Sequence, residues 1–473
     1  MLQKKTKIVC TIGPATESKE KLEALLKAGM NVMRLNFSHG DFAEHQVRVN
    51  NLREVASKLN MTVAILQDLG GPKIRIGNFK TDSVDLIEGA KFTITTDDIV
   101  GDEHRVSVNY PNFPKEVEKG HIIYLHDGRK KLQVLDVKGN DVICRVLVGG
   151  DIKGKRGVNL PDSDLSISSL TDKDKKDLVF GVKNKVDFMA LSFVRRPEDI
   201  LELREILKKA KSKAQIIAKI ETPQAIKNID KIIELVDGIM VARGDLAIEV
   251  PAENVPVLQK MIIKKCMSAG KPVITATQML ESMIKAPVPT RAEVSDIANA
   301  ILDGTDAVML SEETALGSFP VQAVEVMTRV AQNIEGSINN QQSLLREVLH
   351  TPLQSVNESI TASVVKTAER VSAKYIVALT MTGRTSRLIS RYKPNQPILA
   401  VTPNDSTCRH TVLSYGVFPV KVENFSDFSD SLNVIRTFLL KNKLAVKGDK
   451  VVIASGMPFG KVTDTNMMVV ETL

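Results

Sequence analysis

The 473-residue chain contains no tryptophan, few other aromatic residues and only four cysteines. Aromatic residues make up 4% of the chain, which disfavours a stacking platform for nucleic-acid bases. The cysteines lie far apart without metal-ligand spacing, which indicates reduced thiols in a cytoplasmic protein (Cys10, Cys144, Cys266 and Cys408). No apolar run is long enough to span a bilayer, and the lysine-rich start after Met1 lacks a secretion signal. We therefore expect no membrane partner.

The charge of the chain is basic but not clustered. There are 64 Lys and Arg against 56 Asp and Glu, a formal net charge of +8 that suits small anionic ligands. A nucleic-acid-binding protein usually concentrates such an excess in a stripe, and none stands out, so we expect no nucleic-acid partner. The length predicts two to four domains with a substantial core.

Eight apolar, strand-like runs alternate with helical patterns once one interruption is removed. The predicted strands are Thr6–Ile12, Asn31–Asn36, Val63–Asp68, Phe188–Phe193, Gln215–Ile220, Gly238–Ala242, Val273–Thr277 and Ala307–Leu310. Helices with a 3.6-residue period are predicted over Lys19–Ala28, Glu198–Lys209, Gln224–Leu235, Val255–Ala269, Arg291–Asp303 and Pro320–Ile334. Eight strand–helix units predict an α/β fold, a TIM (β/α)8 barrel; a doubly wound sheet is the alternative that this count disfavours.

Two further units are predicted around this barrel. Between Pro72 and Leu160 the pattern changes to short β-type runs punctuated by Gly-Asn, Asp-Gly and Gly-Gly pairs. This predicts an all-β domain over residues 72–160, inserted in a barrel of residues 1–71 and 161–338 and placed as a lid. A polar stretch at 339–342 then precedes a new strand–helix alternation, which predicts a C-terminal α/β domain over residues 339–473.

Polar residues gather at the carboxyl ends of the predicted strands, where TIM barrels carry function. Lys219 and Glu221 fall on one side of their strand because side chains alternate, and the next strand ends at Asp245. Two carboxylates and an ammonium suit a divalent metal and an anionic substrate. Other strand ends offer Arg34, Asn36, Ser38, His39, Asp68, Lys73, Arg75, Ser192, Arg195, Arg243, Thr275, Thr277, Gln278, Ser311, Glu312 and Glu313.

This set of side chains predicts phosphoryl transfer assisted by Mg²⁺. Glu221 and Asp245 would bind the metal, while Lys219 and Arg34 neutralise phosphoryl oxygens. Two alternatives stay open. One is a Mg²⁺-dependent barrel lyase or aldolase acting on the enolate of a 2-oxo acid, although a lyase needs no nucleotide lid. The other is a non-catalytic metabolite sensor on the same fold, although such a sensor need not keep Lys219 or both carboxylates.

Several long motifs resemble the signatures of the pyruvate kinase family. They are Met33-Arg-Leu-Asn-Phe-Ser-His-Gly40, Lys219-Ile-Glu221, Val241-Ala-Arg-Gly-Asp-Leu246, Thr275-Ala-Thr-Gln-Met279, Val308-Met-Leu-Ser-Glu-Glu-Thr314 and Gly157-Val-Asn-Leu-Pro161. The resemblance covers nearly the whole chain and is closest to the bacterial type. It implies a TIM barrel with a β lid after the third strand, a C-terminal α/β domain and a homotetramer. It also implies transfer of the phosphoryl group of phosphoenolpyruvate to ADP, which gives pyruvate and ATP in glycolysis.

The resemblance implies roles for individual residues as well. Mg²⁺ or Mn²⁺ would be held by Glu221 and Asp245. The implied catalytic residues are Lys219, Arg34, Thr277, Arg75 and Ser311, and the substrate would contact Arg34, Lys219, Gly244, Asp245 and Thr277. The nucleotide side would include Asn36, His39 and Arg156. For Ser311 and His39 a purely structural role is the alternative.

One departure from the family pattern concerns a monovalent cation. The resemblance implies an oxygen cage formed by Asn36, Ser38, Asp68 and Leu69. Members that need K⁺ typically carry Glu where this chain has Lys73. A tethered ammonium is a compact monovalent charge, so we expect Lys73 to replace the ion and K⁺ not to be required. A lysine that is simply solvated on its loop is the alternative.

A second loop, in the C-terminal unit, has the composition of a phosphate site. Thr380, Thr382, Gly383, Arg384 and Thr385 join a predicted strand to a helix, so hydroxyl groups and a helix N-terminus meet there. In the family this loop binds a phosphorylated sugar or nucleotide activator, and we expect the same here. A plain Ser/Thr-rich helix cap is the alternative.

Overall fold

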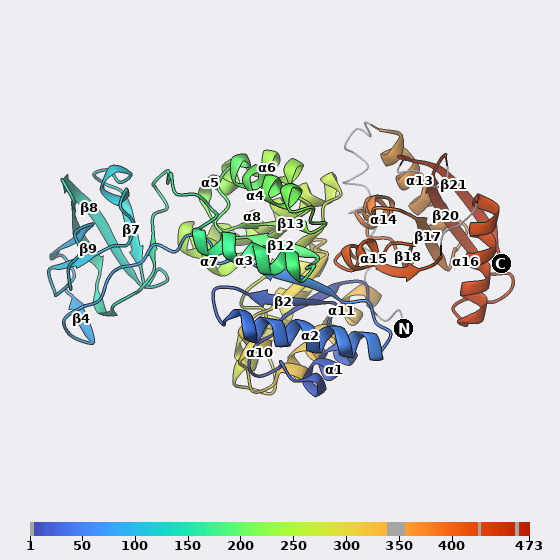
Figure 1. Ribbon diagram of the computed structural model, residues 1–473, viewed down its shortest axis with the longest axis horizontal. Coiled ribbons are helices and arrows are strands. Elements are labelled where there is room, and N and C mark those ends of the chain that lie inside the picture. Colours follow the sequence, from blue (N-terminus) through green and yellow to red (C-terminus); the bar gives the residue numbers. More distant parts are fainter. Residues whose placement is uncertain (1–3, 338–354, 424–426, 459–462) are drawn as a thin grey trace.

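The computed structural model describes residues 4–337, 355–423, 427–458 and 463–473 (Figure 1). Eight parallel strands close into a barrel in the order β1-β16-β15-β14-β13-β12-β3-β2, which confirms the predicted TIM barrel. The strands are β1 (Lys7–Thr11), β2 (Val32–Asn36), β3 (Ala64–Asp68), β12 (Phe188–Leu191), β13 (Gln215–Ile220), β14 (Gly238–Ala242), β15 (Val273–Ala276) and β16 (Ala307–Leu310). Their residues are almost all buried because both faces of the barrel wall are covered.

Helices cover the outside of the barrel. They are α1 (Lys19–Ala28), α2 (Phe42–Lys58), α3 (Asp172–Lys183), α4 (Pro197–Lys209), α5 (Pro223–Lys227), α6 (Ile229–Leu235), α7 (Arg243–Glu249), α8 (Val255–Ala269), α9 (Arg291–Leu302), α10 (Glu312–Ala315) and α11 (Pro320–Ser337). Their ends follow local chemistry: Thr171 and Thr290 close capping boxes, and Gly270 ends α8 in the left-handed conformation. The helix predicted over Gln224–Leu235 is two helices, because the chain leaves helical geometry at Asn228.

The inserted segment forms a separate β unit, called the lid below, which projects from one side of the barrel (Figure 1). A six-stranded sheet has the order β11-β7-β8-β9-β5-β6, and β10 pairs with β4. The strands are β4 (Ser83–Leu86), β5 (Lys91–Thr95), β6 (Arg105–Ser107), β7 (Ile122–Leu125), β8 (Lys130–Lys138), β9 (Asp141–Val148), β10 (Gly150–Lys153) and β11 (Val158–Asn159). Buried side chains such as Phe92, Ile94 and Leu132 give the lid its own core, distinct from that of the barrel.

The C-terminal unit lies on the opposite side of the barrel from the lid (Figure 1). Its sheet has the order β19-β18-β17-β20-β21, flanked by helices. The elements are β17 (Tyr375–Leu379), β18 (Ile398–Thr402), β19 (Val417–Lys421), β20 (Lys450–Gly456), β21 (Thr465–Thr472), α13 (Val356–Arg370), α14 (Arg384–Ser390), α15 (Asp405–Thr411) and α16 (Phe428–Lys441). The predicted domain boundary at 338 and 339 lies outside the described residues.

The C-terminal unit covers the amino ends of the barrel strands. Val412 and Leu413 complete the hydrophobic cluster inside the barrel. The buried Lys393 ammonium lies 2.8 Å from Asp306, which directly precedes β16. The carboxyl ends of the strands therefore face the lid, and this is where the predicted site lies. Within the described parts of the chain, no helix is both long and apolar enough to cross a membrane.

Candidate active site at the carboxyl ends of the barrel strands

The ammonium of Lys219 lies at the centre of a buried charge cluster. Its Nζ is 2.8 Å from Glu221 Oε1 and 3.3 Å from Asp68 Oδ1, and it donates a hydrogen bond of 2.7 Å to Ser192 Oγ. Burial alone would lower the pKa of Lys219, but the carboxylates of Asp68, Glu221 and Asp245 raise that pKa above its ordinary value. Lys219 therefore stays a cation at any physiological pH.

A second cation, Arg34, shares one carboxylate with Lys219. Arg34 Nε donates to Asp68 Oδ2 at 2.7 Å, and its Nη1 donates to Thr11 Oγ1 at 2.7 Å. Burial opposes the ionised form of Asp68, but Lys219 and Arg34 together hold the pKa of Asp68 below its ordinary value. Asp68 thus fixes the two cations side by side at the carboxyl ends of the strands.

The two carboxylates predicted to bind a metal lie on neighbouring strands. Lys219 on β13 is in register with Met240 on β14, which brings Glu221 and the first turn of α7 with Asp245 to the same side of the barrel. Glu221 Oε2 accepts a 2.7 Å hydrogen bond from the Phe193 backbone. Burial raises the pKa of Glu221, and Asp245 adds to this effect while Lys219 opposes it.

These two carboxylates suit a hard divalent cation. Glu221 Oε1 is buried and accepts no geometrically sound hydrogen bond, even though it forms the ion pair with Lys219. Among the described residues no group of three or more His, Cys, Asp or Glu side chains gathers as a metal cage. Two carboxylates with open positions for water and substrate oxygens are typical of Mg²⁺ sites, so the residues present fit this ion.

Thr277 lies in a strained turn against the start of α7. Both Thr277 (φ 72°) and Gln278 (φ 54°) adopt left-handed conformations that non-glycine residues rarely take. Thr277 Oγ1 accepts a 2.7 Å hydrogen bond from the Gly244 backbone and donates one to the Ala276 carbonyl. The Gly244 N–H predicted to receive the substrate carboxylate is therefore engaged by Thr277 in this structure, and a ligand would have to displace that hydroxyl.

Two of the strand-end residues lie outside the charge cluster. Arg243 donates to Asp296 Oδ1 at 2.7 Å and to the Thr277 carbonyl at 2.8 Å, so it supports the strained turn. Thr275 is wholly buried and donates to Thr305 Oγ1, inside the barrel wall. Arg243 therefore holds the turn at Thr277 in place, and Thr275 belongs to the core.

The residues of the predicted monovalent-cation cage are close in the structure. Asn36 Oδ1 accepts from the Ser38 backbone at 3.1 Å, and Leu69 is buried with its carbonyl accepting from Ser192 Oγ at 2.8 Å. Lys73 Nζ donates to Ser38 Oγ at 3.1 Å. Lys73 is exposed, but partial desolvation, Lys219 and Arg75 lower its pKa, while Asp245 and Asp68 oppose the change. The Lys73 ammonium thus reaches the predicted cage from its loop.

Of the three residues predicted for the nucleotide side, Arg156 lines a cavity between the barrel and the lid, whereas Asn36 and His39 do not. Arg75 pairs with Gly157 across an isolated bridge, and Arg75, Arg156 and Asp245 line one cavity of about 270 Å³. His39 is exposed. Its partial desolvation and the cations Lys73, Arg34 and Arg75 lower its pKa. The site therefore presents an electropositive wall toward the lid.

Ser311 is the N-cap residue that precedes the short helix α10, and a buried acid holds it in place. Its backbone N–H donates to Glu313 Oε2 at 2.6 Å, and Glu313 also accepts from the Leu280 backbone. Burial raises the pKa of Glu313. These contacts fix the position of Ser311 and favour neither a catalytic nor a structural role.

The predicted effector loop is closed by its own hydrogen bonds. Thr380 Oγ1 accepts a hydrogen bond from the Gly383 backbone at 2.9 Å, and the Thr382 carbonyl accepts one from the Arg387 side chain. Arg384 pairs with Asp464 at 2.8 Å. Thr385 Oγ1 and Thr465 Oγ1 lie 2.8 Å apart. Part of the segment facing this loop, residues 459–462, lies outside the described residues.

Sequence reasoning assigned no role to Glu249, a polar residue near the site. Glu249 accepts a 2.7 Å hydrogen bond from Asn159, which joins α7 to strand β11 of the lid. Burial raises the pKa of Glu249 to about 7. Glu249 follows Asp245 by four residues, so both fall on one face of a helix, and that spacing is the signal that could have identified it.

Comparisons with known proteins cover the whole chain. The family model described as pyruvate kinase, barrel domain, matches residues 3–324, and the one described as pyruvate kinase, alpha/beta domain, matches residues 358–471. A pyruvate kinase of Geobacillus stearothermophilus is 45% identical over 100% of this chain and 81% of its own length. One of Clostridium acetobutylicum is 44% identical over 99% of both chains. A solved pyruvate kinase from Cryptosporidium parvum superposes with a TM-score of 0.94 at 39% identity, covering 99% of this chain and 96% of that one. The chain therefore belongs to the pyruvate kinase family and is a phosphotransferase with that family's function.

Proposed function

We propose that the cluster around Lys219 carries out this function by moving the phosphoryl group of phosphoenolpyruvate to ADP, which gives pyruvate and ATP. The observation that supports it is the permanent Lys219 cation, held between Asp68 and Glu221 and beside Arg34. Charge that develops on the transferred group and on the enolate oxygen meets two cations that are already in place, so little reorganisation is needed.

Glu221 and Asp245 would hold the divalent metal, Mg²⁺ or Mn²⁺, that the family uses. When bound, the metal supplies a further positive charge to the substrate oxygens. Arg34 and Lys219 bind the phosphoryl group, and the start of α7 at Gly244 and Asp245 receives the carboxylate. Thr277 lies beside Gly244 and would position the proton that the enolate takes up. Arg75 and Ser311 would also belong to the catalytic residues and would support the groups that contact the substrate.

The nucleotide would occupy the cavity between lid and barrel, which Arg156 lines. Asn36 and His39 do not line that cavity and would approach the nucleotide from the end of β2. Lys73 would complete the cage of Asn36, Ser38, Asp68 and Leu69 in place of K⁺. The loop from Thr380 to Thr385, with Thr382, Gly383 and Arg384, would bind a phosphorylated sugar or nucleotide activator. We also propose that the protein is a cytoplasmic homotetramer. In each chain the barrel domain would span residues 1–71 and 161–338, the lid residues 72–160, and the C-terminal domain residues 339–473.

The test is the initial rate of ATP formation from phosphoenolpyruvate and ADP, with pyruvate measured through lactate dehydrogenase. The rate should require a divalent metal and should fall at least about a hundredfold in Lys219→Met. Lys208→Met is the matched control, since Lys208 is exposed in the last turn of α4 and lines neither the cavity between barrel and lid nor the second cavity discussed below. Release of pyruvate and inorganic phosphate from phosphoenolpyruvate without ADP would instead show hydrolysis, with water rather than ADP as the phosphoryl acceptor.

A further inference from the structure

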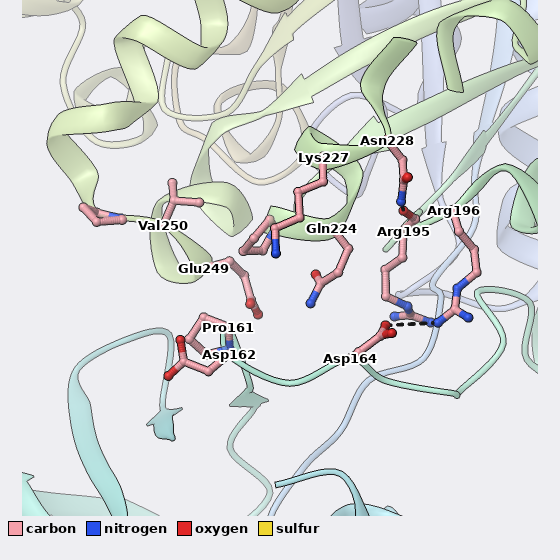
Figure 2. A pocket seen from close by; sticks show the side chains of 12 residues that line it. Pro161, Asp162, Asp164, Arg195, Arg196, Gln224, Lys227, Asn228, Glu249 and Val250 are labelled. Carbon is pink, nitrogen blue, oxygen red and sulfur yellow. Dashed lines mark hydrogen bonds and ion pairs between the residues drawn. The ribbon is translucent and has the colours of Figure 1, made fainter. Parts of the chain in front are cut away.

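A second cavity, of about 730 Å³, lies beside the segment through which the chain passes from the lid back into the barrel (Figure 2). Residues 161–169 form this connection and are called the return linker below. Its walls include Asp162 and Asp164 of the return linker, Arg195 and Arg196 after β12, and Gln224 and Lys227 of α5. Lys219, Arg34 and Glu221 do not line this cavity. It is therefore distinct from the proposed phosphoryl site, although it shares Arg195, Gln224 and Glu249 with the cavity of about 270 Å³ between barrel and lid.

The carboxylates that line this cavity already have partners. Asp164 Oδ1 lies 3.3 Å from Arg196 Nη2, and Asp162 Oδ2 accepts from the Ile122 backbone at 2.9 Å. Glu249 accepts from Asn159. The acidic groups are thus occupied, and the cavity holds no unpartnered acid that would attract a cation.

In the part of the chain that the structure describes, two cations of the cavity, Arg195 and Lys227, form no ion pair at contact distance, although Asp199, Asp164 and Glu249 attract Arg195 from farther away. Arg195 is 4% exposed, its Nε is buried with no hydrogen-bond partner, and its Nη2 donates to the Ile167 carbonyl. Within the described residues no carboxylate comes within ion-pair distance of the guanidinium of Arg195 or the ammonium of Lys227. Lys227 extends toward the middle of the cavity (Figure 2). Carboxylates beyond contact distance offset the burial of Arg195 only in part, because burial still lowers its pKa, and an anion in the cavity would complete the compensation. Lys227 is exposed, so its ammonium can turn toward such an anion at little cost.

We propose that this cavity binds a small anion bearing phosphate or carboxylate groups, held by Arg195 and Lys227 with Arg196 at its edge. Guanidinium groups match both kinds of oxyanion, and the ammonium of Lys227 adds a mobile charge. The volume is in the range of small-metabolite pockets.

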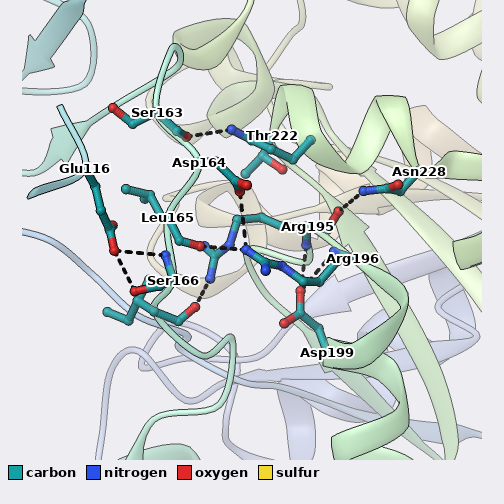
Figure 3. A network of polar contacts seen from close by, with 12 residues as sticks. Glu116, Ser163, Asp164, Leu165, Ser166, Arg195, Arg196, Asp199, Thr222 and Asn228 are labelled. Atoms are coloured by element: carbon teal, nitrogen blue, oxygen red, sulfur yellow. Dashed lines mark hydrogen bonds and ion pairs between the residues drawn. The ribbon is translucent and has the colours of Figure 1, made fainter. Parts of the chain in front are cut away.

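The proposed ligand would touch the groups that hold the lid. Arg196 donates to the Leu165 carbonyl at 2.8 Å, and Gln224 donates to the Ser163 carbonyl at 2.8 Å. Arg195 donates a third hydrogen bond, to the Ile167 carbonyl. Side chains of the barrel thus bind three backbone carbonyls of the return linker, in the network that Figure 3 shows. A bound anion would tie Arg195, Lys227 and the return linker together. Occupancy of the cavity would therefore stabilise one position of the lid.

The test is hydrogen exchange of the full chain, read by mass spectrometry over residues 161–169, with inorganic phosphate and malonate as separate probes. At a probe concentration about ten times the dissociation constant, linkage predicts roughly tenfold slower exchange of linker amides that open only in the free form. Lys227→Glu should abolish the slowing. Lys231→Glu is the matched control: it makes the same charge change at an exposed position of α6 that does not line the cavity.

Slowing by phosphate alone would identify a phosphate ligand, and slowing by malonate alone a carboxylate ligand. Unchanged exchange over 161–169 with both probes, or equal slowing in Lys227→Glu and in the parent, would overturn the proposal. Phosphate bound at the strand-end site is read separately, in peptides that contain Lys219. ATP formation in the same preparations tests the proposed reaction independently, so the two proposals can fail separately.

Discussion

Replacing Lys219 by methionine should separate catalysis from metal binding. Lys219 Nζ lies 2.8 Å from Glu221 Oε1. At an effective dielectric constant of about 20, that separation corresponds to roughly 6 kcal/mol of attraction before desolvation is subtracted. The ammonium and a metal ion would compete for the same oxygen. We therefore expect Mn²⁺ to bind Lys219→Met at least as tightly as the parent, because Glu221 loses a competing cation.

Catalysis should respond in the opposite direction. Loss of one preorganised charge at a developing oxyanion typically costs about 3–4 kcal/mol, so kcat should fall by about 10²–10³. The variant should still fold, because Arg34 keeps its 2.7 Å pair with Asp68. Lactate dehydrogenase coupling measures kcat, and the electron paramagnetic resonance signal of free Mn²⁺ measures binding. A kcat within tenfold of the parent, or Mn²⁺ binding weakened more than tenfold, would refute this reasoning.

Three other variants test separate parts of the molecule. Lys73→Glu should lose most of its rate in tetramethylammonium buffer and regain it with KCl, whereas a many-fold response of the parent to KCl would contradict the internal-cation role. Arg384→Ala should keep the basal rate but lose activation by sugar phosphates or AMP, measured as the shift in half-saturation by phosphoenolpyruvate; an unchanged shift would place the effector elsewhere. Burial and the neighbouring Lys4 lower the pKa of Lys7 to about 7, against an unfolded value of 10.5. Between these values the unfolded chain binds the extra proton, so stability rises with pH, by about 1.4 kcal/mol per unit. Lys7→Met should lack this slope when the free energy of unfolding is measured by denaturation from pH 7 to 10. Parallel plots of that free energy against pH for the parent and the variant would exclude this role of Lys7.

The barrel was predictable because its strands carry the signal in consecutive residues. The runs around Gln215–Ile220 and Gly238–Ala242 are continuous and apolar, and the structure has strands with the same bounds. The sequence pattern did not predict the short strands β4 and β10 of the lid. They hold four residues each and are stabilised by pairing with one another across more than sixty residues of sequence.

The site was predictable in composition but not in contacts. The sequence motifs identified Lys219, Glu221 and Asp245 as site residues. They did not predict the hydrogen bond from Lys219 to Ser192, because that bond depends on how β12 and β13 are aligned. The engagement of Gly244 by Thr277 depends on a left-handed turn that no residue preference indicates. Such details arise from packing between strands and loops distant in sequence, which local patterns do not encode.

The insertion of the lid between β3 and β12 has a consequence for biosynthesis. During translation, three barrel strands emerge first, and the lid residues follow with a hydrophobic core of their own. The barrel closes only when β16 pairs with β1, through contacts such as Lys7 with Ala307. The lid can therefore fold on the ribosome while the first three strands still expose unpaired edges. Closure of the ring, with its long-range pairing, should be the slow step of folding in this chain.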